Sequence, residues 1–205
     1  MSTAPSPQQQ LVAALGKRRI EMVVIGGSAG GVDALVGLLP GLPAGFGPAV
    51  ACILHVPADR ESRLAEVFAT RAALPVREAR DKEPIAPGTV YFAGSGYHLS
   101  VEEDRSFSLS CEAPVQFARP AIDILMESAA EAYGDALAGI LLTGANFDGA
   151  DGMCRIRECG GLTIVQDPEE AQARSMPEEA IRRCAPHLVL PLSAIRTVLP
   201  LLETP

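Results

Sequence analysis

The stretch EMVVIGGSAGGVDAL, residues 21–35, decides the fold that we predict for this chain. Residues 20–26 form a short apolar run, typical of a strand buried on both faces, and residues 31–43 have the apolar spacing of a helix. Between them a cluster of glycines surrounds a single serine, Ser28. A buried strand that turns sharply into a helix is typical of a parallel sheet covered by helices.

The rest of the chain repeats this pattern with one interruption. Residues 48–56 predict a second buried strand and residues 60–72 a second helix. Residues 75–111 change to short β-rich pieces between turns, which predict an antiparallel β-hairpin excursion. From residue 119 onward helices and strands alternate again. We therefore predict an α/β fold, a three-layer α/β/α sandwich on a mostly parallel, doubly wound sheet.

Composition limits the classes of protein to consider. A chain of 205 residues with 48% hydrophobic content suits one domain, which we place at residues 20–205. Residues 1–19 begin with a polar, Pro-rich segment, and we expect them to form a disordered tail. The net charge of -8 argues against nucleic acid as a partner. No run reaches the roughly 18 apolar residues of a membrane helix, so we expect a cytoplasmic protein without membrane insertion.

The five cysteines show no CxxC pair and no spacing with histidine that suits zinc. Cys52 lies in an apolar run and is expected in the core, whereas Cys154 and Cys159 lie on one predicted helix. We expect reduced thiols, with no metal site and no cofactor.

Three polar residues stand where predicted parallel strands end, which is the edge at which active sites form in such sheets. Ser28 lies in a G-x-S-x-G pattern after the first strand, His55 ends the second, and Asp148 follows the strand that ends at Thr143. Together they have the chemistry of a nucleophile, a base and a carboxylate that orients the base. Each also has a simpler interpretation, because Ser28 and Asp148 could cap helices and His55 could be structural.

Other interpretations of these residues remain open. His98, at the start of a hairpin strand, is a competing base or a cleft residue, whereas His187 is expected to be structural. A dinucleotide-binding turn would need glycine at position 28 and an acidic residue at the end of the second strand. Ser28 and His55 occupy those two places, so the sequence disfavours this alternative.

Several motifs together resemble the catalytic domain of the chemotaxis protein-glutamate methylesterases (CheB). GGSAGG, LHVP, RPAIDILM and LTGANFDGADGM occur in the order in which that family has G-A-S-T-G-G, a strand ending in H-M or H-x-P, R-P-S-x-D-x-L and T-G-M-G-x-D-G. The resemblance covers nearly everything from residue 20 to residue 195 and is specific in order and spacing.

The resemblance implies that Ser28 is the nucleophile, His55 the general base and Asp148 its partner. The implied reaction is hydrolysis of glutamate γ-methyl esters, with possible deamidation of glutamines, on the cytoplasmic helices of chemoreceptors. Ala29, Gly30, Ala145 and Asn146 are then expected around the oxyanion site. Ala29 replaces the family's Thr, Ala145 and Asn146 replace its Met-Gly, and Ala118 replaces a histidine.

About 20 residues precede the first strand, too few for the phospho-receiver domain that common family members carry, so we expect a stand-alone form. Separately, we expect a monomer. Two alternatives to the methylesterase stay open. One is a non-catalytic, CheB-like adaptor in a chemosensory pathway, and the other is an esterase that acts on a different ester.

Overall fold

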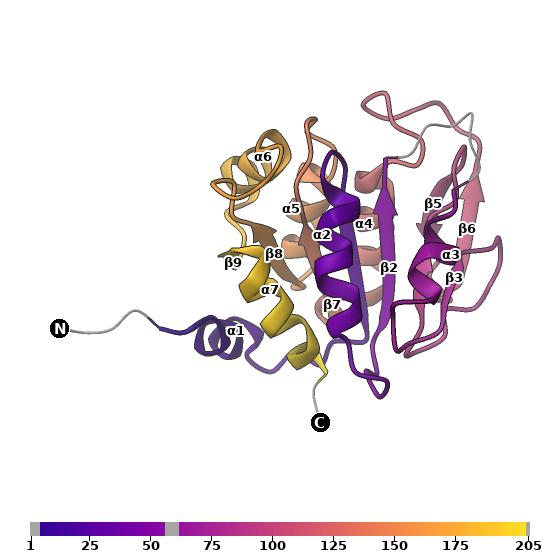
Figure 1. The fold of residues 1–205 in the computed structure, drawn as a ribbon. Helices are drawn as coiled ribbons and strands as arrows, with labels where there is room; N and C mark the ends of the chain where they lie inside the picture. The colour runs from indigo at the N-terminus through magenta and orange to yellow at the C-terminus, as the bar shows by residue number, and fades with distance from the viewer. Residues whose placement is uncertain (1–4, 56–61, 204–205) are drawn as a thin grey trace.

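A computed structural model describes residues 5–55 and 62–203 (Figure 1). Seven parallel strands form one sheet in the order β3-β4-β2-β1-β7-β8-β9. In that order they are β3 (Val76–Glu78), β4 (Val90–Phe92), β2 (Ala49–Leu54), β1 (Met22–Gly27), β7 (Leu137–Leu141), β8 (Leu162–Gln166) and β9 (Leu188–Leu190). The chain moves from β1 to β2 on one side and later to β7 on the other, so the strand order reverses at β1. The carboxyl ends of β1, β2 and β7 are therefore neighbours at this switch point.

Helices cover both faces of the sheet, as Figure 1 shows with α2 and α7 in front and α4 and α5 behind. One buried cluster joins the sheet to the front helices, and a second joins it to the rear helices. The helices are α1 (Pro7–Leu15), α2 (Gly31–Leu38), α3 (Leu64–Ala69), α4 (Ile122–Tyr133), α5 (Ala150–Glu158), α6 (Ser175–Cys184) and α7 (Leu192–Val198), with 3₁₀ turns η1 (Leu39–Gly41), η2 (Gly134–Ala136) and η3 (Leu199–Leu202). The predicted three-layer, doubly wound sandwich is confirmed.

The predicted hairpin excursion over residues 75–111 is confirmed only for residues 98–110, because β3 and β4 in the same range pair parallel within the main sheet. β5 (His98–Val101) and β6 (Phe107–Ser110) pair antiparallel and form a separate two-stranded sheet. Phe107 packs edge-on against Tyr91 of β4, with ring centroids 4.9 Å apart. The apolar face of the hairpin thereby extends the rear cluster beside α4.

The prediction of a disordered tail at residues 1–19 is wrong for residues 7–15, which form α1, while residues 1–4 lie outside the described residues. Ser6 and Gln9 form a capping box at its start, in which each side chain accepts a hydrogen bond from the other's backbone N–H. Leu11 and Leu15 are buried one turn apart, and α1 lies against α7 and β9. Burial of this apolar pair offsets the polar composition of the segment.

We predict that Leu11→Ala destabilises the protein by about 2–4 kcal/mol, because it leaves a cavity under α1. Val12→Ala is the matched control, since Val12 lies on the same helix and is 69% exposed. Its effect is expected to stay within about 0.5 kcal/mol. Denaturant unfolding measures both values, and equal effects of the two substitutions would show that α1 does not pack as described.

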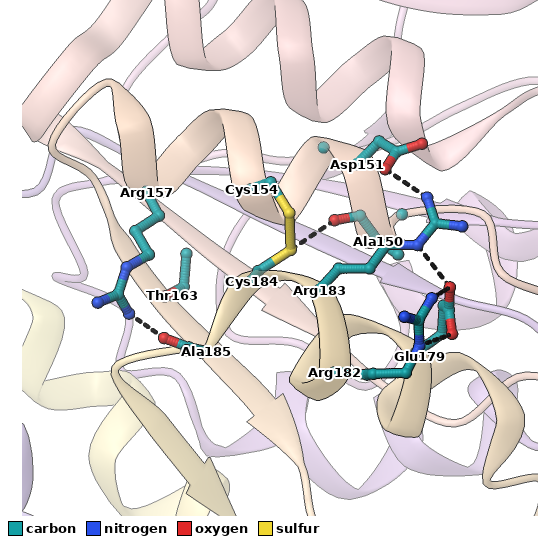
Figure 2. The surroundings of a disulfide bond; sticks show 12 residues. Ala150, Asp151, Cys154, Arg157, Thr163, Glu179, Arg182, Arg183, Cys184 and Ala185 are labelled. Carbon is teal, nitrogen blue, oxygen red and sulfur yellow. Dashed lines mark hydrogen bonds and ion pairs between the residues drawn. A yellow bond between two sulfur atoms is a disulfide. The ribbon is translucent and has the colours of Figure 1, made fainter.

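The prediction that all cysteines are reduced is wrong for one pair. Cys154 of α5 and Cys184 of α6 form a disulfide, with their Cα atoms 4.8 Å apart, while Cys52, Cys111 and Cys159 are free (Figure 2). The same two helices are joined by an ion pair between Arg183 and Asp151, at 2.6 Å. Thirty residues separate the two bonded cysteines, so their contact arises from the packing of α5 on α6 rather than from local spacing.

We predict that thiol titration of the unreduced, denatured protein gives three reactive thiols per chain and that reduction raises the count to five. Cys184→Ser is the control. It should give four thiols without reduction, because Cys154 is then left without its partner. Five thiols in the unreduced wild type would contradict the disulfide.

Among residues 5–55 and 62–203, no helix has the length and apolar character needed to cross a membrane. The same residues contain no cluster of His, Cys, Asp or Glu side chains arranged to hold a metal ion.

Candidate active site

Ser28 lies in a tight turn between the end of β1 and the start of α2. Its backbone N–H donates to the carbonyl of Thr143, at 2.9 Å, and its own carbonyl accepts from the N–H of Gly31, at 2.8 Å. Gly30 has a φ of 81°, which L side chains rarely adopt, and a Cβ atom there would lie only 2.8 Å from Cβ of Gln172. Glycine is therefore required at this position, and the turn holds Ser28 at the carboxyl edge of the sheet.

His55, directly after β2, links Ser28 to Asp148. Its Nδ1 lies 3.1 Å from Oγ of Ser28, and its Nε2 lies 2.7 Å from Oδ2 of Asp148. When Nε2 carries the proton and donates to Asp148, Nδ1 is left to accept the serine proton. This is the reverse of the ring orientation in serine proteases, but it gives the same division into one donor and one acceptor. The structure thus brings together the three residues that were predicted at the strand ends.

Asp148 is fully buried and holds the start of α4 as well as His55. Its Oδ2 accepts from the N–H of Ile122, at 2.7 Å, and its Oδ1 accepts from the N–H of Asp123, at 2.9 Å. Burial alone would raise the pKa of Asp148, but the hydrogen bonds from His55 and from these two N–H groups outweigh it and hold the pKa below its ordinary value. Asp148 is therefore ionised at neutral pH, as a partner for an imidazolium must be.

Thr143, two residues after the end of β7, anchors the turn that carries Ser28. Its hydroxyl donates to the carbonyl of Ala29, at 2.9 Å, and accepts from the N–H of Ala173, at 2.8 Å. Its N–H donates to Oε1 of Gln166, at 2.9 Å. The sequence had identified Thr143 only as the residue at which a strand ends.

Comparison with known proteins agrees with this geometry. The sequence profile of the family described as CheB methylesterase matches residues 23–199. The chain belongs to the CheB methylesterase family. A Leptospira interrogans relative is 43% identical over 175 residues, which cover 85% of this chain and 91% of that protein.

A longer relative and a solved structure extend the comparison. A Symbiobacterium thermophilum relative, named protein-glutamate methylesterase/protein-glutamine glutaminase, is 35% identical over 93% of this chain and 55% of its own length. The crystal structure of the Thermotoga maritima CheB methylesterase catalytic domain superposes with a TM-score of 0.84 at 32% identity, covering 89% of this chain and 98% of that one. The fold of this chain is therefore that of a CheB catalytic domain.

Three residues at which this chain departs from the CheB pattern, Ala29, Ala145 and Asn146, lie in the turns that follow β1 and β7. Ala29 and Gly30 lie at the N-terminus of α2, and within the described residues their backbone N–H groups donate to no protein atom. Asn146 presents its Nδ2 to Nδ1 of His55 at 3.5 Å, while its Oδ1 is buried without a partner in the same residues. Ala145 is exposed beside it. These groups are placed where a developing oxyanion could be stabilised.

The interpretation of His98 as a competing base or cleft residue is wrong. Its ring is buried, its Nε2 donates to the carbonyl of Ala113 at 3.1 Å, and its Nδ1 accepts from the N–H of Ala121 at 3.2 Å. Both nitrogens are occupied by backbone groups, because β5 runs under the start of α4 instead of over the sheet edge. His187 bonds the backbone N–H and hydroxyl of Thr163, in keeping with the structural role expected of it.

Asp123 is a buried carboxyl group to which the sequence assigned no role. Its Oδ1 accepts from the N–H groups of Gly149 and Gly152, both at 2.8 Å. Burial raises the pKa of Asp123 to about 7, against the hydrogen bond from Gly152, and the charge of Asp148 adds to the increase. A usable signal existed in the sequence, since Asp123 shares a helical face with the apolar Met126 and Ala130.

The raised pKa of Asp123 predicts a pH-dependent loss of stability. The folded protein retains this proton up to about pH 7, whereas the unfolded chain releases it near the ordinary value of 3.8. The stabilisation is therefore complete below that ordinary pKa and is lost as the pH rises through about 7. At about 1.4 kcal/mol per pKa unit, the loss relative to Asp123→Asn amounts to a few kcal/mol.

Denaturant unfolding of wild type and Asp123→Asn, from about pH 4 to about pH 8, measures this difference. Subtracting one curve from the other cancels the titration of the remaining carboxylates. Parallel curves over the whole range would contradict the raised pKa.

Proposed function

We propose that the protein is a serine hydrolase that removes methyl groups from glutamate γ-methyl esters of chemoreceptors. The observation that carries this proposal is the continuous hydrogen-bonded series from Ser28 Oγ through His55 to Asp148. Membership of the CheB methylesterase family supports the substrate class, because a relative that matches most of this chain bears the name of that activity.

Acylation follows from the geometry. Ser28 Oγ attacks the ester carbonyl carbon while its proton passes to Nδ1 of His55, and Asp148 stabilises the imidazolium through Nε2–H. The tetrahedral oxyanion forms near the N-terminus of α2, where the N–H groups of Ala29 and of the N-cap Gly30 donate to no protein atom within the described residues. His55 then returns its proton from Nδ1 to the methoxy oxygen, and methanol leaves an acyl-enzyme on Ser28.

Deacylation repeats these steps with water as the nucleophile. His55 Nδ1 takes a proton from the water as it attacks the acyl carbon, and then returns that proton to Ser28 Oγ. The products are a glutamate carboxylate and the free serine. Because the acyl-enzyme is the same when the leaving group is ammonia, the site supports glutamine deamidation by the same residues, in keeping with the glutaminase part of the relative's name.

The proposed partner is the methylated cytoplasmic helix of a chemoreceptor, as the family resemblance implies, and the proposed place of action is the cytoplasm. We propose that the protein acts there as a monomer. The substitutions at Ala29, Ala145 and Asn146 alter the rim of the site but leave the three reacting side chains in contact. This intact triad supports an enzyme over a non-catalytic adaptor.

Release of methanol from methylated receptor tests the proposal. We expect Ser28→Ala to lower kcat by at least about 10³-fold, because the nucleophile is lost. Asp148→Asn should lower it by about 10²- to 10⁴-fold, since the amide no longer stabilises the imidazolium. Ser193→Ala, at an exposed position on α7, is the control and should keep the wild-type rate.

Equal rates for wild type and Ser28→Ala would refute the nucleophile assignment. Absence of activity in both, on receptor and on a small activated ester, would favour the adaptor. Hydrolysis of the small ester without demethylation of receptor would favour an esterase for a different substrate.

A further inference from the structure

Two buried carboxyl groups, those of Asp148 and Asp123, cap the N-termini of α4 and α5 reciprocally. Asp148, which precedes α5, accepts from two N–H groups in the first turn of α4. Asp123, in the first turn of α4, accepts from the N–H groups of Gly149 and Gly152 at the start of α5. Asp148 therefore caps the helix that carries Asp123, and Asp123 caps the helix that directly follows Asp148.

This reciprocal capping supplies the acceptors that the N-cap residues of α4 and α5 do not provide. The N-cap residues are Ala121 for α4 and Gly149 for α5, and neither can offer a side-chain oxygen to the N–H groups of the first turn. Buried N–H groups without a partner are costly, so an oxygen acceptor from another part of the chain is needed at both places. At Gly149 a residue with a capping side chain would be strained, because φ is 96°, a conformation that L side chains rarely adopt.

Asp123 is linked to the reacting side chains through the backbone that it binds, at Gly149 and Gly152. It is 5% exposed, and its Oδ2 accepts from Nε2 of Gln116 at 3.1 Å, so it is enclosed by protein on both oxygens. Gly149, which it holds, is the residue after Asp148. Any displacement of Gly149 therefore moves the carboxylate that orients His55.

We propose that Asp123 is a positioning residue, which fixes the backbone from Asp148 to Gly152 and thereby keeps the Asp148 carboxylate aimed at Nε2 of His55. The inference rests on the proposed function for its kinetic consequence, but the geometry that it concerns can be measured without any substrate. The role requires an oxygen acceptor at Oδ1 and not a negative charge, because neutral amide oxygens also accept from N–H groups.

Three variants separate positioning from general destabilisation. Asp123→Asn keeps an acceptor at Oδ1 and removes the charge. Asp123→Ala removes the acceptor and leaves the N–H groups of Gly149 and Gly152 unpaired. Ile156→Ala is the matched control. Ile156 is fully buried on α5 but lies in its last turn, away from the N-terminal turn that Asp123 holds.

The first readout is the downfield proton NMR signal of Nε2–H of His55, assigned by its absence in His55→Gln. We expect this signal in wild type, Asp123→Asn and Ile156→Ala, and its loss in Asp123→Ala at a temperature where circular dichroism shows the variant folded. If Asp123→Ala does not fold, Asp123→Ser takes its place, since one hydroxyl on a shorter side chain cannot reach both N–H groups.

The second readout is turnover on a small activated ester. Asp123→Ala should lower kcat by about 10- to 100-fold with KM within about threefold, as expected when a catalytic group is misplaced by a fraction of an ångström to an ångström. Asp123→Asn should remain within about fivefold of wild type near neutral pH, and Ile156→Ala should keep kcat while its unfolding midpoint falls.

Retention of the signal and of kcat in folded Asp123→Ala would overturn the proposal. So would an equal loss in Ile156→Ala, which would show that any loosening of α5 has the same effect. An equal loss in Asp123→Asn would show that the charge, and not the acceptor, is what matters. If wild type hydrolysed no ester at all, the proposed function would fail, yet the NMR comparison would still decide the role of Asp123.

Discussion

The Asp148 carboxylate is the group on which the rest of the site depends. An ionised carboxylate in a fully buried position is unfavourable unless both oxygens are hydrogen-bonded, and Asp148 meets this condition with three donors. One of them is the imidazole of His55 and two are N–H groups at the start of α4. The carboxylate that orients His55 therefore also attaches α4 to the edge of the sheet. A change in the position of α4 would therefore also change the proposed catalytic site.

Close packing of helix on strand makes that attachment possible. A Cβ atom at Gly26 of β1 would lie 2.5 Å from Cγ2 of Ile122, the first residue of α4. Without a side chain at Gly26, the N-terminus of α4 approaches β1 closely enough for Asp148 to reach it. The glycines around Ser28 thus serve two purposes, since Gly30 shapes the turn that presents the serine and Gly26 admits the helix that anchors its partners.

Predictions from the sequence succeeded where they rested on apolar runs within one element or on residues at the ends of parallel strands. Alternating apolar runs predicted the parallel sheet, and Ser28, His55 and Asp148 could be placed together because parallel strands bring their carboxyl ends to one edge. Predictions failed where a contact joined distant segments. His98 was expected near the cleft, but its ring lies under α4, and the polar segment around α1 folds because Leu11 and Leu15 find a surface made by α7 and β9.

The sequence by itself determined the sandwich fold, the family and the three residues of the proposed triad, because these depend on hydrophobic periodicity and on motifs within single strand ends. Only the tertiary structure decided which nitrogen of His55 faces Ser28, that Cys154 joins Cys184, and that Asp123 and Asp148 each hold the other's helix. These features depend on how α4, α5 and α6 pack against one another. Contacts between elements separated by tens of residues leave no periodic trace in a single sequence.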